Sequence, residues 1–272
     1  MGMAFDTSGN LYVNESPTAV GSTSSSVSEG PRRINLATGT VTNLATSTTF
    51  YYLYGIAVDS AGNVYTSEAS SSTSASATGK IRKIAVTTEV VTTLASAAAF
   101  SFPKGLALDS SGTYLYVASG SGSTVLGAYK ITKITVATGA YVNIATSYLW
   151  SQPYGLAVDT TGNIYVSNYG ADAIVRIDAS TQATSLLASS TAFSALRGLS
   201  VDGYGNVYVI EYSRYVYKIT QGWSLGGVAS TLATSTSWTS MNWIATDASG
   251  NVYISELGSS TNRLNRIRVI AA

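Results

Sequence analysis

The segment PYGLAVDTTGNIYVSN, residues 153–168, contains the pattern that decides the fold. A small apolar run begins at Gly155, an Asp-x-x-Gly-Asn turn follows at Asp159, and a hydrophobic-Tyr-hydrophobic run surrounds Tyr165. β-branched and aromatic residues on both sides of a glycine-containing turn predict two antiparallel strands joined by a tight hairpin. In such a turn the aspartate accepts backbone N–H groups and the glycine supplies a positive φ.

The same pattern occurs six times along the chain. The other copies read GMAFDTSGNLYVNE from Gly2, GIAVDSAGNVYTSE from Gly55, GLALDSSGTYLYVAS from Gly105, GLSVDGYGNVYVIE from Gly198 and WIATDASGNVYISE from Trp243. The turn aspartates Asp6, Asp59, Asp109, Asp159, Asp202 and Asp247 are separated by 53, 50, 50, 43 and 45 residues. This period fits one four-stranded propeller blade per repeat.

The rest of each repeat supplies two more strands. A third strand ends in a basic residue followed by Ile, and a fourth resembles VTNLATS from Val41. Fourth strands follow only five of the six repeats. We therefore predict an all-β, six-bladed β-propeller whose last blade lacks its outer strand within this chain. The single domain spans residues 1–272, with blades at approximately 1–49, 50–99, 100–149, 150–192, 193–237 and 238–272.

The incomplete last blade predicts an exposed edge strand from Arg263 to Ile270. We expect the natural chain to be longer, or else this blade to have three strands. A free edge of this kind can accept a strand from a partner or from another copy of the chain, so self-assembly is one expected property.

The amino-acid composition limits the classes of function that this chain can have. Charged residues make up 11% of the chain, the net charge is +1, and no Lys/Arg cluster exceeds two adjacent residues, which argues against a nucleic-acid partner. Without cysteine or histidine, disulfides, thiolate metal sites and the commonest general base are excluded. No apolar run approaches the ~18 residues of a membrane span. The Ser/Thr-rich, Cys-free composition is typical of bacterial surface and secreted proteins, so we expect an extracellular or cell-surface location, or a periplasmic one.

The segment from Pro153, with Arg176-Ile177 after it, resembles NHL repeats, and this resemblance covers nearly the whole chain. It implies a six-bladed propeller, in most cases an interaction platform. The segments GNVYVIE and GNVYISE also look like the repeat of streptogramin lyases, whose chemistry uses a histidine and a magnesium ion. A further resemblance is to the gluconolactonase group. It implies metal ligands at Asn242, directly before a first strand, and at Glu256, which closes the next strand, although Trp243 replaces the family's glycine.

Loops before the first strands share one face with loops after the second strands. Residues directly before the first-strand glycine, or at the same place in the last blade, should ring the channel mouth: Tyr54, Lys104, Tyr154, Arg197 and Asn242. Aromatic residues of the same loops, with Trp150 and Trp243 among the candidates, suit a protein, peptide or glycan ligand. The alternative is that loop aromatics fill the spaces between blades.

Acidic residues close four of the second strands: Glu15, Glu68, Glu211 and Glu256. Together with Asn242 they form a candidate site for Ca²⁺ or another divalent cation. The alternative is that each glutamate bonds to backbone or pairs with a basic residue of its own blade. Every blade has such a residue before the third-strand Ile: Arg33, Lys83, Lys133, Arg176, Lys218 and Arg266. We expect the turn aspartates to cap their own hairpins.

These patterns favour a non-catalytic binding or scaffolding module without a cofactor, which binds a protein, peptide or glycan through the aromatic face and channel mouth. One alternative is a metal-dependent lactonase-like or lyase-like enzyme. Another is a structural subunit of a surface array or filament.

Overall fold

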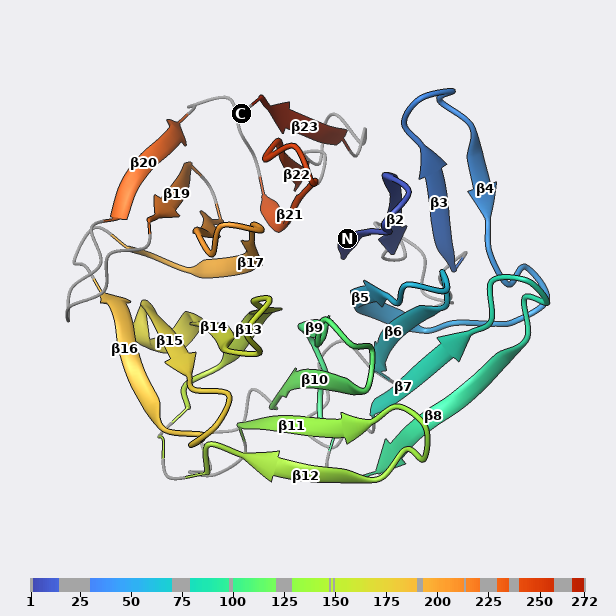
Figure 1. The fold of residues 1–272 in the computed structure, drawn as a ribbon, viewed down its shortest axis with the longest axis horizontal. Helices are drawn as coiled ribbons and strands as arrows, with labels where there is room; N and C mark the ends of the chain where they lie inside the picture. The colour runs from blue at the N-terminus through green and yellow to red at the C-terminus, as the bar shows by residue number, and fades with distance from the viewer. Residues whose placement is uncertain are drawn as a thin grey trace, which may run out of the picture.

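The protein folds into six antiparallel β-sheets arranged around a central axis (Figure 1). The structure is a computed structural model and describes residues 2–14, 30–69, 79–97, 100–120, 129–146, 148, 150–189, 193–212, 214–220, 229–234, 240–256 and 266–271. The predicted all-β, six-bladed propeller is confirmed. In the described ranges the one helical segment is the short 3-10 turn η1, Tyr169–Ala171, and no helix is long and apolar enough to span a bilayer.

Five sheets have four strands, ordered from the axis outward as they follow one another in the chain. They are β1 Met3–Phe5, β2 Asn10–Asn14, β3 Pro31–Asn35 and β4 Val41–Asn43; β5 Tyr52–Val58, β6 Val64–Ala69, β7 Gly79–Ile84 and β8 Val91–Ala97; β9 Leu106–Leu108, β10 Tyr114–Ser119, β11 Lys130–Thr135 and β12 Tyr141–Ile144; β13 Pro153–Val158, β14 Ile164–Asn168, β15 Ala173–Ile177 and β16 Thr184–Ser189; β17 Leu196–Val201, β18 Val207–Glu211, β19 Tyr215–Ile219 and β20 Ala229–Thr234.

The sixth sheet has three strands, β21 Met241–Thr246, β22 Val252–Glu256 and β23 Arg266–Ile270. β23 is its outermost described strand, with Val269 54% exposed. Among the residues that the structure describes, the last blade thus has no outer strand, as predicted. The first part of the predicted edge, Arg263 to Asn265, lies outside the described residues.

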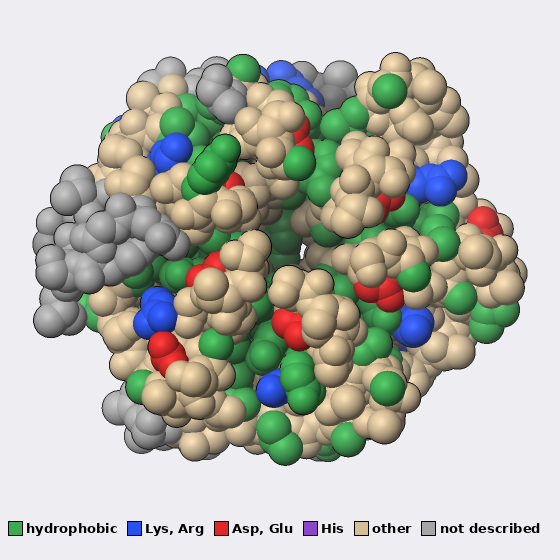
Figure 2. All heavy atoms as spheres, in the orientation of Figure 1, with side chains coloured by type: hydrophobic (Ala, Val, Ile, Leu, Met, Phe, Trp, Pro, Cys, Tyr) green, Lys and Arg blue, Asp and Glu red, His purple; other side chains and the backbone are tan. Residues whose placement is uncertain are grey.

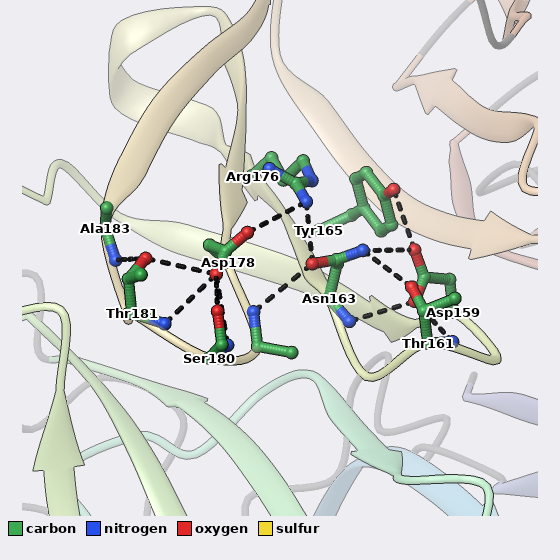
Figure 3. Close-up of polar contacts among 10 residues, drawn as sticks. Asp159, Thr161, Asn163, Tyr165, Arg176, Asp178, Ser180, Thr181 and Ala183 are labelled. Carbon is green, nitrogen blue, oxygen red and sulfur yellow. Dashed lines mark hydrogen bonds and ion pairs between the residues drawn. The ribbon is translucent and has the colours of Figure 1, made fainter.

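Each hairpin between the first two strands of a blade is held by its aspartate, as predicted. In the fourth blade, Asp159 Oδ1 accepts the backbone N–H groups of Thr161 and Asn163, both at 2.9 Å. Its Oδ2 accepts the side-chain amide of Asn163 and the hydroxyl of Tyr165 (Figure 3). Burial opposes ionisation, but these hydrogen bonds outweigh it and hold the pKa of Asp159 below its usual value. The turn aspartates are therefore structural.

The basic residues of the third strands lie opposite the second-strand tyrosines. The register pairs Tyr12 with Arg33, Tyr65 with Lys83, Tyr116 with Lys133, Tyr165 with Arg176 and Tyr208 with Lys218. Arg266, which also precedes an Ile of its third strand, does not share this position. Val269 lies opposite Tyr253, and Arg266 lies opposite Glu256, three residues away along the strand.

Glycine in the first strand allows adjacent blades to approach at the axis. A Cβ atom on Gly55 would lie 2.2 Å from the carbonyl oxygen of Lys104, and one on Gly155 would lie 2.4 Å from that of Arg197. No side chain fits at such distances, so the glycine sets the spacing between innermost strands. The seam between the sixth and first blades is different, because Trp243 packs there against Met3 and Leu11.

Buried serines bond the blades to each other at the same level. Ser67 Oγ of the second blade accepts the N–H of Gly55 and donates to the carbonyl oxygen of Lys104 in the third blade, both at 2.8 Å. Ser167 accepts the N–H of Gly155 at 2.8 Å and donates to the carbonyl oxygen of Arg197. These bonds fix the backbone of the residue directly before each next first-strand glycine.

Aromatic residues five positions before the first-strand residue fill the spaces between blades. Phe50, Phe100, Trp150 and Phe193 are all buried, and each belongs to a cluster formed by two neighbouring blades. Large apolar side chains at this position stabilise the ring by removing apolar surface from water. For these four residues the space-filling alternative holds.

The close approach of the blades gives a stability prediction. Gly155→Ala would press its new methyl group against the Arg197 carbonyl, so we expect it to lower the free energy of unfolding by about 1–3 kcal/mol. The matched control is Gly203→Ala, because no atom lies within 4 Å of the Cβ position there. Denaturant unfolding of both variants measures the difference. Equal stability of the two variants would contradict the role assigned to Gly155.

Candidate functional site

Five side chains from five blades meet at one end of the central channel. They are Tyr54, Lys104, Tyr154, Arg197 and Asn242, and we call them the mouth cluster. In four of these blades the pairing of the first two strands shifts register at this place, between Leu53 and Ile56, Pro153 and Leu156, Leu196 and Leu199, and Met241 and Trp243. A bulge of this kind takes a residue out of regular pairing and redirects its side chain.

Tyr154 is the centre of the mouth cluster. Its ring lies 4.7 Å from Lys104 Nζ and 5.4 Å from Arg197 Cζ, so cations from both neighbouring blades contact it. It also reaches the sixth blade, where its ring centroid is 5.6 Å from that of Trp243 and its hydroxyl donates to Asn242 Oδ1 at 3.5 Å. Tyr154 therefore extends from the fourth blade across the axis to the sixth.

Arg197 connects the fifth and sixth blades. Its guanidinium group donates a hydrogen bond to Asn242 Oδ1. The same group stacks on Tyr212, with 3.8 Å between Arg197 Cζ and the ring centroid. Asn242 is 5% exposed, and its amide nitrogen donates to the carbonyl oxygen of Ser240 at 2.9 Å. Both ends of the Asn242 amide thus have partners within the protein.

The mouth cluster is positively charged at neutral pH. Burial, reinforced by the nearby charge of Arg197, lowers the pKa of Lys104 to about 8. Burial raises the pKa of Tyr54 to about 12, and it also raises the pKa of Tyr154 in spite of the opposing effect of Arg197. At neutral pH both hydroxyls are therefore protonated, and the cluster has two positive charges and no negative one.

The predicted acidic set does not converge in the part of the chain that the structure describes, where no three acidic side chains are grouped. Glu68 accepts from Arg82 Nε at 2.8 Å and from the backbone N–H of Tyr51 at 3.0 Å. Glu256 accepts from Arg268 Nε at 2.6 Å. Glu211 accepts from the Tyr217 hydroxyl at 3.3 Å, and burial raises its pKa. Glu15 lies outside the described residues.

The basic partners of these glutamates are not the ones expected. Glu68 pairs with Arg82 rather than Lys83, and Glu256 pairs with Arg268 rather than Arg266. Alternate residues of a strand face opposite sides of a sheet. Arg82 lies two positions from Lys80, the residue directly opposite Glu68, so it shares the face of Glu68, whereas Lys83 lies on the other face. Arg266 and Arg268 both share the face of Glu256, and the glutamate pairs with the one two positions farther along. The alternative reading, in which each acid bonds within its own blade, holds for Glu68, Glu211 and Glu256.

These contacts test whether the channel mouth fits a divalent cation. The neutral oxygen of Asn242 accepts from a guanidinium group, and the carboxylate of Glu256 is paired with Arg268. Lys104 and Arg197 would also repel a metal ion placed between them. The described side chains of the mouth therefore do not fit a divalent cation in this arrangement.

Two of the predicted ligand-facing residues lie elsewhere. Trp150 is packed between the third and fourth blades against Tyr148, and its Nε1 donates to the carbonyl oxygen of Ala145 at 3.3 Å. Trp243 is 5% exposed and contributes to the seam with the first blade, although it contacts Tyr154. Both side chains act mainly as packing elements.

Sequence reasoning missed two tyrosines beside the mouth cluster. Tyr212 stacks on Arg197, and the ring of Tyr169 lies 6.4 Å from that of Tyr154. Each follows directly after the last residue of a second strand, in Asn168-Tyr169 and Glu211-Tyr212. This shared position in the repeat is the signal by which they could have been found.

The opposite end of the channel is a cavity of about 340 Å³. Small side chains of the six first strands line it, namely Ala4, Ala57, Ala107, Ala157, Ser200 and Ala245. Figure 2 views this face, and carboxylates surround the central opening while lysine and arginine side chains lie farther out. The rim includes Asp6 and Asp59, whose oxygens accept hydrogen bonds from their own hairpins. The cationic mouth and the acidic rim thus lie at opposite ends of one channel.

Comparison with known families identifies the group to which this propeller belongs. The model of the SMP-30/gluconolactonase/LRE-like region matches residues 1–195. The chain belongs to this family. The expected relationship to gluconolactonase-like propellers is confirmed by the match. Comparison with curated proteins gives no significant match.

Solved structures confirm the fold of this family member. Regucalcin from Agrobacterium tumefaciens, described as a calcium-binding protein, is 13% identical with a TM-score of 0.68, over 100% of this chain and 90% of that chain. A chain of a nidogen/laminin complex is 15% identical with a TM-score of 0.68, over 97% and 94%. Virginiamycin B lyase from Staphylococcus aureus is 15% identical with a TM-score of 0.61, over 100% and 83%. At these identities the similarity shows the fold alone.

The lowered pKa of Lys104 gives a pH-dependent prediction. Between the folded pKa of about 8 and the unfolded value of 10.5, the unfolded chain binds more protons at this residue. Raising the pH through this window should therefore stabilise wild type relative to Lys104→Met, by about 1–3 kcal/mol. Denaturant unfolding of both proteins at about pH 7 and about pH 10 measures the change, because other titrating groups cancel in the difference. A constant or opposite difference would contradict the buried, charged lysine.

Proposed function

We propose that this family member is a non-catalytic binding module, whose mouth cluster and adjacent tyrosines bind a protein, peptide or glycan. The observation that carries the proposal is the hydrogen bond from Arg197 to Asn242 Oδ1. Asn242 is one of two positions at which the chain resembles the metal ligands of gluconolactonases, and here an arginine of the protein engages it. Glu256, the other position, is paired with Arg268.

The surface around the mouth cluster supports a binding role. Tyr212, which stacks on Arg197, is 36% exposed, so it offers aromatic surface next to the polar groups of the mouth. Tyrosine contributes large contact area with little loss of side-chain freedom and is enriched in binding sites. One of the similar solved structures is a nidogen/laminin complex, a protein assembly. The proposed location, outside the cytoplasm, rests on composition alone.

The binding role predicts a specific loss on mutation. Screening of glycan and peptide arrays should identify a ligand that wild type binds and that the triple variant Tyr54→Ala/Tyr154→Ala/Arg197→Ala does not. Because that variant removes buried contacts, Tyr212→Ala is the second test, and we expect it to weaken binding about tenfold or more. The matched control is Tyr204→Ala, since Tyr204 is 84% exposed and follows a hairpin aspartate on the opposite face. Equal binding by wild type and Tyr212→Ala would place the ligand elsewhere.

Family membership favours a second candidate, a metal-dependent lactonase-like or lyase-like enzyme. Its test is a thermal shift with Ca²⁺, Mg²⁺, Mn²⁺ or Zn²⁺ that a chelator reverses, together with hydrolysis of a lactone. The binding proposal predicts neither effect. A chelator-sensitive shift that Asn242→Ala and Glu256→Gln both abolish would establish the enzyme instead.

The three-stranded last sheet favours a third candidate, self-assembly through β23 in an array or filament. Unpaired N–H and C=O groups of an edge strand can pair with a second copy. This candidate requires concentration-dependent association in sedimentation experiments, and loss of that association when a proline replaces Val269. A monomer at all concentrations would exclude it.

A further inference from the structure

The cations of the mouth cluster lack the carboxylate partner that three half-buried arginines of the described chain have. Arg82, Arg176 and Arg268 each form an ion pair with a carboxylate of their own blade. Lys104 and Arg197 have no such partner among the described residues, where they contact aromatic side chains and the neutral amide of Asn242. Two positive charges thus share one tyrosine ring without a counter-charge.

Several donor groups of these residues also remain unused. Arg197 Nε is buried and has no hydrogen-bond partner in the described part of the protein. Lys104 Nζ contacts the ring of Tyr154 but forms no hydrogen bond or ion pair with a described residue. A lysine has three N–H donors and an arginine has five, all of which water would satisfy if the groups were exposed. Of these donors, Arg197 Nε is shielded from water, and leaving it buried and unpaired costs free energy.

The backbone holds the two cations in place at this cost. The carbonyl oxygens of Lys104 and Arg197 accept hydrogen bonds from Ser67 and Ser167, and a register shift directs the side chain of Arg197 out of its strand. These bonds fix the backbone positions from which the two side chains extend. A fixed pair of cations with unused donors is the arrangement by which proteins bind oxyanions.

We propose that the mouth cluster binds an oxyanion, a carboxylate of the ligand, between Lys104 and Arg197. The inference rests on the proposed binding function and names the chemical group that the ligand presents. A carboxylate has one negative charge and two acceptor oxygens, and so it matches one ammonium and one guanidinium group. The protonated hydroxyl of Tyr54 is a further donor at the same mouth. A phosphate has the same donor requirements and is separated by experiment.

The test uses isothermal titration calorimetry with simple probes at constant ionic strength. Sodium D-glucuronate supplies a carboxylate on a sugar ring, methyl β-D-glucopyranoside is its neutral counterpart, and inorganic phosphate is the alternative oxyanion. We expect wild type to bind glucuronate at least tenfold more tightly than the neutral sugar. Lys104→Met should lose this preference, and Lys104→Arg, which keeps the charge, should restore most of it.

A matched control separates the mouth from general charge effects. Lys133 also lies over a tyrosine ring, with its Nζ 3.6 Å from the centroid of Tyr114, but it belongs to the third strand of its blade. Lys133→Met should bind glucuronate as wild type does. If Lys133→Met and Lys104→Met lost glucuronate binding equally, the loss would be an effect of net charge, and the proposed site would be wrong.

The remaining outcomes distinguish this inference from the proposed function. Binding of the neutral sugar or of an array ligand with no contribution from Lys104 would overturn the oxyanion site and leave the binding module intact. If oxyanions bind in a Lys104-dependent manner but the arrays identify no ligand, the result would support the oxyanion site and count against the binding module. Lys104-dependent binding of phosphate more tightly than glucuronate would support an oxyanion site and assign the group as a phosphate rather than a carboxylate.

Discussion

The close approach of the innermost strands at the axis is the constraint on which the rest of the structure depends. Glycine at the first-strand position lets the backbone of one blade lie against the carbonyl group of the next, and a buried serine then bonds the two blades. The serine hydroxyl donates to the carbonyl oxygen of the residue directly before the next blade's glycine, which is a residue of the mouth cluster. The spacing of these blades and the position of the mouth cluster therefore have one cause, and a change in that spacing would move the cluster.

This geometry brings different chemistry to equivalent positions. The residue five places before the first-strand residue is aromatic in every blade from the second to the sixth, and the four that the structure describes are buried between blades. The residue one place before it is Tyr, Lys, Tyr, Arg and Asn in the same blades. The aromatic position is uniform because every blade must fill the space beside its neighbour. The position directly before the first-strand residue has no such packing role, so its residue type can differ between blades. The variable position surrounds the channel, and the proposed ligand site lies there.

The sequence allowed the architecture and the membership of the mouth cluster to be predicted, because both follow from repeat position. It did not allow side-chain partners to be predicted. Glu68 pairs with Arg82 and not with the adjacent Lys83 because of the strand face that each occupies, and a one-residue error of register reverses that face. Arg266 and Arg268 share the face of Glu256, so the repeat pattern does not distinguish them. Tyr154 reaches across the axis because its side chain is long and because a bulge redirects it. Neither feature appears in the repeat pattern of the sequence.

The most direct test of this account is amide hydrogen exchange at Gly55 and Gly155, measured by NMR. Both N–H groups donate to buried serines that also bond the next blade. If these bonds hold the ring together, both amides exchange only when the whole domain unfolds, with the same free energy as global unfolding. Exchange as fast as that of the hairpin turns would show that the blades separate locally at the axis, and the account of the channel mouth would be wrong.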